Sequence, residues 1–153
     1  MNKFKIILKK ETIYIAEGGS VIGDICFCIG NWYFPEENWD DFVVSLIYWL
    51  SYVIVELNFN KKKKVQMRFM EGDFKIYLTL GKNYQCTIEF IEGDTCEDQK
   101  EIIHKTITIP FEDVKNEVKK ACELLLQMKK SKELDFEEDY EDLKDSYELL
   151  CKI

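Results

Sequence analysis

The order of apolar and polar positions predicts strands at the beginning of the chain. Residues 4–8 and 12–16 are short apolar runs separated by charged residues, and residues 24–29 form a third run. Gly18, Gly19 and Ser20 provide a turn before the third run, and Gly30 with Asn31 breaks the chain after it. This part of the chain therefore predicts three short strands.

A helix that is apolar on almost every side is predicted next, ending at about residue 57. Asn38 is its expected N-cap, with Asp40 and Asp41 in the first turn, where carboxylates complement the helix dipole. All three tryptophans lie in or just before this helix, at positions 32, 39 and 49. We expect Trp49 to be buried, because its neighbours in the helix are apolar too. The pattern places this helix at the centre of the core.

Strict alternation then predicts a β-meander over residues 65–90. Apolar residues point one way in the runs 65–69, 74–80 and 84–90, which glycine-containing turns separate. An acidic loop, residues 92–101, leads to a last strand over 102–109, whose inward residues are expected to be Ile103, Ile107 and Ile109. Because the turns of the meander are short, its strands must be antiparallel.

Two helices are predicted to close the chain. Pro110 opens the first, in which apolar residues recur every three or four positions. The second is a weaker pattern within the acidic segment 131–153, with the apolar stripe Phe136, Tyr140, Leu143, Tyr147 and Leu150. Together the elements predict one α+β domain over residues 1–153. We expect a mainly antiparallel sheet of about six or seven short strands, packed by the central apolar helix and one or two C-terminal helices.

The composition fits a globular protein of the cytoplasm. Apolar residues make up 46% of the chain, which argues against disorder. The N-terminus does not resemble a secretory signal, and residues 42–57 are too short for a comfortable membrane span. We therefore expect a cytoplasmic location and no membrane association.

Six cysteines without a signal sequence indicate free thiols in a reducing compartment. They lie at positions 26, 28, 86, 96, 122 and 151. Cys26 and Cys28 would share one face of a strand, but a lone pair in a chain with one histidine is weak evidence for zinc, which takes four ligands. Core thiols are the preferred interpretation and metal binding a distant second. We predict no metal and no cofactor.

The negative charge is concentrated at the C-terminal end. The net charge is −8, and residues 131–153 contain nine acidic residues and three lysines, a net charge of −6. This block argues against a nucleic-acid partner, because phosphate recognition is mostly cationic. It is compatible with a basic protein partner or with solubility alone.

No motif in the sequence spells out a reaction. His104, the only histidine, falls on the predicted strand 102–109, without a nucleophile in a recognisable local signature. Helix capping explains Asp40 and Asp41, and residues 18–23 lack the Gly-Lys-Ser/Thr ending of a phosphate loop. Arg68, the only arginine, either makes a bidentate pair with a carboxylate or is an exposed strand residue. We predict a protein that is not an enzyme.

The acidic C-terminal segment is the main candidate for a binding surface. Carboxylates steer a basic partner, and tyrosines among them supply contact area. An ordinary solvated helix explains the same residues equally well. The candidate partner-binding residues are Asp135, Glu137, Glu138, Asp139, Tyr140, Glu141, Asp142, Asp145 and Tyr147, together with Arg68.

A family resemblance involves the aromatic segments and one hairpin. The sequences WYFP at 32–35, WDDF at 39–42 and YWL at 48–50, followed by RFMEGDF at 68–74, resemble small bacterial proteins that are similar to immunity proteins of polymorphic toxin systems. The resemblance covers residues 24–90. It implies a cytoplasmic protein that binds and blocks one cognate toxin, often a basic nuclease, and that needs no catalytic residues.

Three functions follow as hypotheses, in order of preference. The first is an immunity protein that neutralises a toxin domain by covering its working surface. The second is a non-catalytic accessory or regulatory domain that binds another protein. The third, a small enzyme, is weakened by the absence of a nucleotide loop, a metal cluster or a histidine-centred constellation in the sequence.

Overall fold

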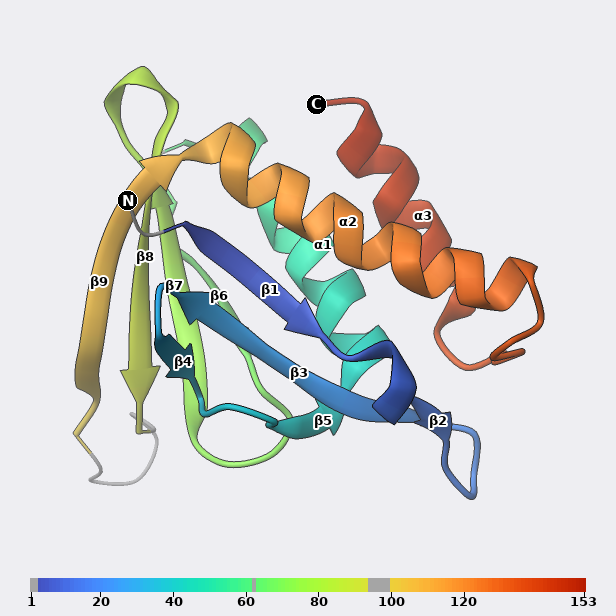
Figure 1. Cartoon of the computed structure of the whole chain (residues 1–153). Helices are drawn as coiled ribbons and strands as arrows, with labels where there is room; N and C mark the ends of the chain where they lie inside the picture. The colour runs from blue at the N-terminus through green and yellow to red at the C-terminus, as the bar shows by residue number, and fades with distance from the viewer. Residues whose placement is uncertain (1–2, 62, 94–99) are drawn as a thin grey trace.

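The computed structural model describes residues 3–61, 63–93 and 100–153 (Figure 1). The α+β class is confirmed, with three helices and nine strands in the described part of the chain. The strands form two antiparallel sheets, so the chain has more strands than the six or seven expected, and two sheets where we expected one. Most of the predicted acidic loop 92–101 lies outside the described residues, as does Cys96.

The first sheet is built around β3. Phe27 of β3 lies between Ile6 on one side and Phe34 on the other, and Ile22 lies between Tyr14 and Phe42. The predicted turn at Gly18 and Gly19 joins β2 to β3, and both glycines have positive φ. The elements are β1 (Phe4–Leu8), a 3₁₀ turn η1 (Lys10–Thr12), β2 (Tyr14–Ile15), β3 (Val21–Ile29), β4 (Trp32–Phe34) and β5 (Asp40–Phe42).

The predicted start of the central helix is wrong. Helix α1 (Val43–Phe59) begins after β5, and Asn38 does not cap it. Asp40 and Asp41 belong to β5, where Asp40 faces Asp24 and Asp41 faces Gly23 of β3. Pairing with a strand distant in sequence therefore outweighs the local preference of these residues for a helix start.

The second sheet is the predicted meander, in the order β6-β7-β8-β9. Its inward alternation holds for the runs at 65–69 and 74–80, but Ile103 of the last strand is exposed. The cause is a bulge, since Phe90 faces Lys105 while Ile91 faces Ile103, which leaves His104 between the two pairs. The elements are β6 (Val65–Arg68), β7 (Phe74–Leu80), η2 (Lys82–Tyr84), β8 (Gln85–Glu92) and β9 (Ile102–Pro110).

The two C-terminal helices are also present. Helix α2 (Phe111–Lys130) starts directly after Pro110, with acidic residues in its first turn and lysines in its last. Helix α3 (Tyr140–Cys151) lies against α1 and α2 and buries Leu143 and Leu150 in the common core.

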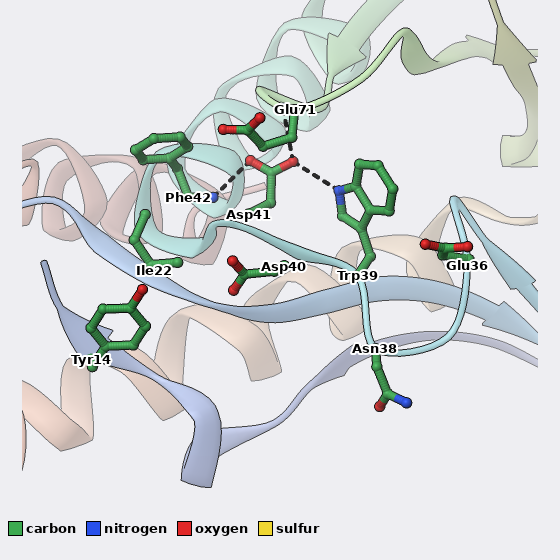
Figure 2. A pocket seen from close by; sticks show the side chains of 9 residues that line it. All are labelled: Tyr14, Ile22, Glu36, Asn38, Trp39, Asp40, Asp41, Phe42 and Glu71. Carbon is green, nitrogen blue, oxygen red and sulfur yellow. Dashed lines mark hydrogen bonds between the residues drawn. The ribbon is translucent and has the colours of Figure 1, made fainter.

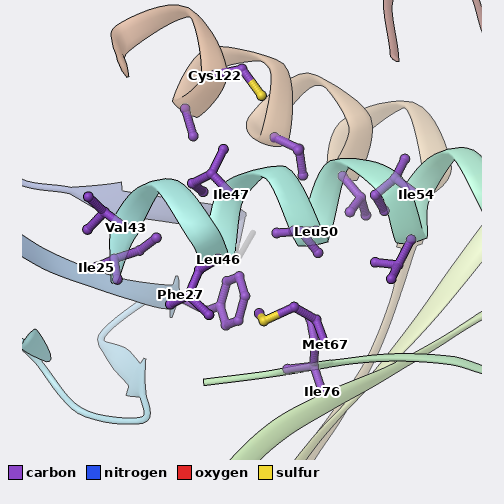
Figure 3. Close-up of a cluster of buried hydrophobic side chains, with 14 of the residues drawn as sticks. Ile25, Phe27, Val43, Leu46, Ile47, Leu50, Ile54, Met67, Ile76 and Cys122 are labelled. Carbon is purple, nitrogen blue, oxygen red and sulfur yellow. The ribbon is translucent and has the colours of Figure 1, made fainter. Parts of the chain in front are cut away.

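Helix α1 is the centre of that core, as predicted (Figure 3). Ile47 points toward Cys122 of α2, and Leu46 points toward Phe27 of the first sheet and Met67 of the second. Trp49, however, is only half-buried, which corrects the expectation of a buried side chain. No described helix combines the length and the apolar character needed to cross a membrane.

Candidate partner-binding surface

Helix α1 turns a row of aromatic side chains toward the surface. Tyr48, Trp49 and Tyr52 are half-buried, and Phe59 is 76% exposed. On an ideal helix these positions share an arc of about 100°. The rings of Tyr48 and Tyr52 meet edge to face, with centroids 6.2 Å apart. The exposed arc explains why Trp49 is not enclosed although its neighbours Leu46 and Leu50 are.

Helix α3 brings carboxylates alongside these tyrosines. At the start of α1, the Ser45 hydroxyl donates a hydrogen bond of 2.8 Å to Asp139. Burial raises the pKa of Tyr48, and the negative charges of Asp139 and Asp142 raise it further. Burial, then Asp142 and Asp145, raise the pKa of Tyr52. Asp139 and Asp142 therefore lie near Tyr48, and Asp142 and Asp145 lie near Tyr52, so α1 and α3 run in the same direction here.

We call this area the α1–α3 surface and define it by Tyr48, Tyr52, Asp139, Asp142 and Asp145. Three of these five residues were candidates from the sequence. The two tyrosines were missed, although their spacing of four residues in an otherwise apolar helix was a usable signal. What the sequence could not reveal is that α3 lies beside them.

The tyrosines that were predicted as anchors are engaged with α2 instead. The ring of Tyr140 packs edge to face on Phe136, with Lys129 of α2 5.0 Å from its centroid. The Tyr147 hydroxyl donates to Glu123 of α2 at 2.9 Å. Burial and this bond raise the pKa of Tyr147. Both rings thus help to fix α3 on α2.

The predicted acids divide into two groups. Asp135 and Glu137 both contact Lys129, with Nζ–O distances of 2.7 and 3.0 Å. The bond to Lys129 lowers the pKa of Asp135. Apart from Asp139, which is half-buried and bonded to Ser45, the remaining acids of α3 and the turn before it point outward. Exposed members of this second group are Glu138, Glu141, Asp142 and Asp145.

Arg68 lies on the second sheet and is not part of the α1–α3 surface. It sits on β6 in register with Lys75 of β7. Lys75 is only 2% exposed and contacts the carboxylate of Glu101, which also accepts a 2.6 Å hydrogen bond from the Tyr77 hydroxyl. His104 lies on the same sheet, with its Nε2 2.8 Å from Glu92. These contacts stabilise the sheet.

A hollow of about 540 Å³ opens at the start of α1 (Figure 2). Beneath it, Asp41 is 1% exposed and accepts three hydrogen bonds, from the Trp39 indole at 3.0 Å and from the backbone N–H groups of Phe42 and Glu71 at 2.7 and 3.2 Å. Asp41 therefore ties β5 to the loop between β6 and β7. The hollow is lined by Tyr14, Ile22, Glu36, Asn38, Trp39, Asp40, Asp41, Phe42 and Glu71.

The charge in this hollow is negative. Asp40 stands directly opposite Asp24 across the strand pair, an arrangement that is destabilising for like charges. Burial raises the pKa of Asp40, and the charges of Asp24 and Asp41 raise it further. Because Ser45 follows Phe42 by one turn of α1 and bonds Asp139, the hollow adjoins the α1–α3 surface.

Replacing Asp41 with alanine is expected to destabilise the fold by about 1–3 kcal/mol, because three donors lose their acceptor in a buried place. The matched control is Asp40→Ala, which removes an exposed carboxylate from the next position and relieves repulsion with Asp24. Urea denaturation of both variants measures the difference. Equal destabilisation by the two substitutions would contradict the role given to Asp41.

Three buried cysteines are held in the thiol form. Burial raises the pKa of Cys26 to about 11 and those of Cys86 and Cys122 to about 12. Within the described ranges, no group of three or more His, Cys, Asp or Glu side chains is placed to hold a metal ion.

Comparison of the chain with protein-family models, with curated proteins and with solved structures finds no match. The resemblance to immunity proteins therefore stays a prediction from the sequence.

Proposed function

We propose that this chain is a cytoplasmic, non-catalytic protein that binds a basic surface of a partner protein through the α1–α3 surface. The observation that carries the proposal is that α3 packs along α1 and Ser45 of α1 bonds Asp139, which brings Tyr48 and Tyr52 near Asp139, Asp142 and Asp145.

This combination suits a partner rich in arginine or lysine. A guanidinium or ammonium group is attracted to the face of a tyrosine ring, and a neighbouring carboxylate adds a charge-assisted hydrogen bond. Tyrosine also provides a large contact area at a low conformational-entropy cost. The outward acids of α3, such as Glu141, would accelerate the encounter at low ionic strength.

The specific role that we propose is that of an immunity protein, which neutralises a cognate toxin by covering its working surface. The family resemblance of residues 24–90 and the acidic surface support this role, since a basic toxin domain is the complementary partner. A non-catalytic accessory or regulatory domain would use the same surface with a different partner. The product of a neighbouring toxin-like gene distinguishes the two roles.

Charge reversal on this surface is expected to weaken binding to that partner. The double variant Asp142→Lys/Asp145→Lys should slow association by about tenfold or more at low salt, because steering by surface charge acts on the on-rate. Tyr52→Ala should instead accelerate dissociation, since removing an anchor acts mainly on the off-rate. Stopped-flow binding at low and high salt measures both effects, and co-expression with the toxin measures protection.

The matched control is Asp73→Lys/Asp113→Lys, which changes the net charge equally at exposed positions outside the α1–α3 surface. This control should keep most of the association rate and full protection. If the Asp142/Asp145 variant binds and protects as well as the control does, the α1–α3 surface is not the binding site.

A further inference from the structure

Strand β9 forms an open edge of the second sheet. It pairs with β8 alone, and no described element lies beyond it (Figure 1). The β1 edge of the first sheet is covered, because α2 lies along it and the Glu117 carboxylate accepts a 3.0 Å hydrogen bond from the Ile6 backbone N–H. Open edges present unpaired backbone groups to any strand that can approach them.

The side chains of β9 shield this edge only in part. Proteins protect an edge with charged side chains, which can point outward or inward, and with bulges. Strand β9 has one charged side chain and one bulge, and it is free of acidic residues in a chain that has 29 of them. Its lysine, Lys105, is turned inward, with Nζ 5.2 Å from the centroid of the Trp32 ring. At the strand's beginning, Ile102 and Ile103 are 55% and 56% exposed.

The lack of acidic groups also points to the occupant. Two copies of a protein with a net charge of −8 repel each other over most of their surface. They repel least where neither strand carries a carboxylate, and no residue of β9 carries one. A second copy of this chain therefore fits this edge electrostatically.

The regular part of β9 defines a register for such a pair. The bulge at His104 interrupts the strand on one side, and Pro110, which has no backbone N–H, ends it on the other. The residues between these limits are centred on Ile107. An antiparallel pair about a twofold axis at Ile107 places Thr106 of each copy opposite Thr108 of the other, and threonine pairs are favourable across strands.

We propose that two copies of the chain associate through β9 in this register, so that their four-stranded sheets join into one continuous sheet. The contact is strand addition, in which main-chain hydrogen bonds supply affinity and the side-chain register supplies specificity. It is independent of the α1–α3 surface and of the partner proposed for it.

Sedimentation velocity over the micromolar range tests the pairing and its register. The wild-type chain should approach twice the monomer mass of 18.2 kDa at high concentration. Thr106→Lys/Thr108→Lys places lysines opposite lysines and should weaken the dimer by about tenfold or more. Thr106→Lys/Thr108→Glu places each lysine opposite a glutamate of the other copy and should restore it, which makes this variant the matched control.

Hydrogen exchange of the wild-type chain at low and high concentration provides a readout that needs no substitution. Amides of residues 105–109 should gain protection as the dimer forms. A monomer at every concentration, a dimer that Thr106→Lys/Thr108→Lys leaves intact, or equal weakening by both double variants would overturn the proposal. So would exchange at residues 105–109 that does not depend on concentration.

Discussion

Replacing Glu101 with glutamine is expected to destabilise the fold by about 3–5 kcal/mol, because the ammonium group of Lys75 would remain buried without its counter-ion. Glu101 contacts Lys75 and accepts a hydrogen bond from the Tyr77 hydroxyl, so that one carboxylate stabilises two groups on the outer face of β7. The free energy of unfolding, measured by urea denaturation, should fall accordingly.

Two control variants separate the buried charge from other effects of the substitution. In Glu101→Gln/Lys75→Met the buried pair is replaced by uncharged side chains, and most of the stability should return. In Glu89→Gln the half-buried partner of the exposed Lys64 is lost from the same face of the sheet, at a Nζ–O distance of 3.1 Å. The loss should stay below about 1 kcal/mol, because the ammonium group of Lys64 remains in water. Similar losses for Glu101→Gln and Glu89→Gln would show that burial of Lys75 does not matter.

The same pair predicts how stability depends on pH. Lys75 and Tyr77 hold the pKa of Glu101 below its ordinary value of 4.5, so the stabilisation by this carboxylate is complete above that pH and is lost as the pH falls through the lowered pKa. Burial lowers the pKa of Lys75, but the bonds to Glu101 and Tyr77 raise it above 10.5, so that contribution is lost only at high pH. The acid-dependent part should be absent from Glu101→Gln.

The elements that could be predicted from the sequence are those whose pattern is long and regular. The meander over 65–90 shows strict alternation, and α2 repeats its apolar residues over twenty positions after Pro110. In both cases the local pattern and the packing in the fold agree, except at Tyr84, which was expected to face inward but lies in η2 and is 48% exposed. The bulge opposite Phe90 and Ile91 breaks the alternation in β9, and no residue pattern in this isoleucine-rich strand predicts the bulge.

The start of α1 shows where local signals mislead. Asn38, Asp40 and Asp41 are residue types typical of a helix N-terminus. Residues 40–42 nevertheless form a strand that pairs with β3. The Asp41 carboxylate does not cap a helix. It is buried and accepts hydrogen bonds from the Trp39 indole and from two backbone N–H groups. Such an arrangement depends on segments far apart in sequence.

The candidate site was predicted in part for the same reason. The periodicity of the sequence predicted the apolar stripe and the acidic side of α3. It does not predict which neighbouring helix contacts the residues on either side of that stripe. One flank carries Tyr140 and Tyr147 to α2, and the other carries Asp139 and Asp142 to α1. The tyrosines that share the surface with acids are therefore those of α1.

Replacing Phe34 with alanine is expected to destabilise the fold by about 3–5 kcal/mol, because a buried aromatic ring that joins the two sheets would leave a cavity. Phe34 lies on β4 of the first sheet and is fully buried. Its ring centroid lies 5.2 Å from Phe90 and 5.6 Å from Phe74, both in the second sheet, and 6.1 Å from Phe69 in the loop that follows β6. The thermal midpoint and the urea midpoint should both fall.

Two further variants show whether the effect arises from this junction. Phe34→Leu keeps part of the volume and should retain more of the stability than alanine does, since the loss grows with the size of the cavity. Phe59→Ala removes the same ring from the exposed end of α1 and should change the free energy of unfolding by no more than about 0.5 kcal/mol. If Phe34→Ala is no more destabilising than Phe59→Ala, the aromatic cluster around Phe34 does not hold the two sheets together.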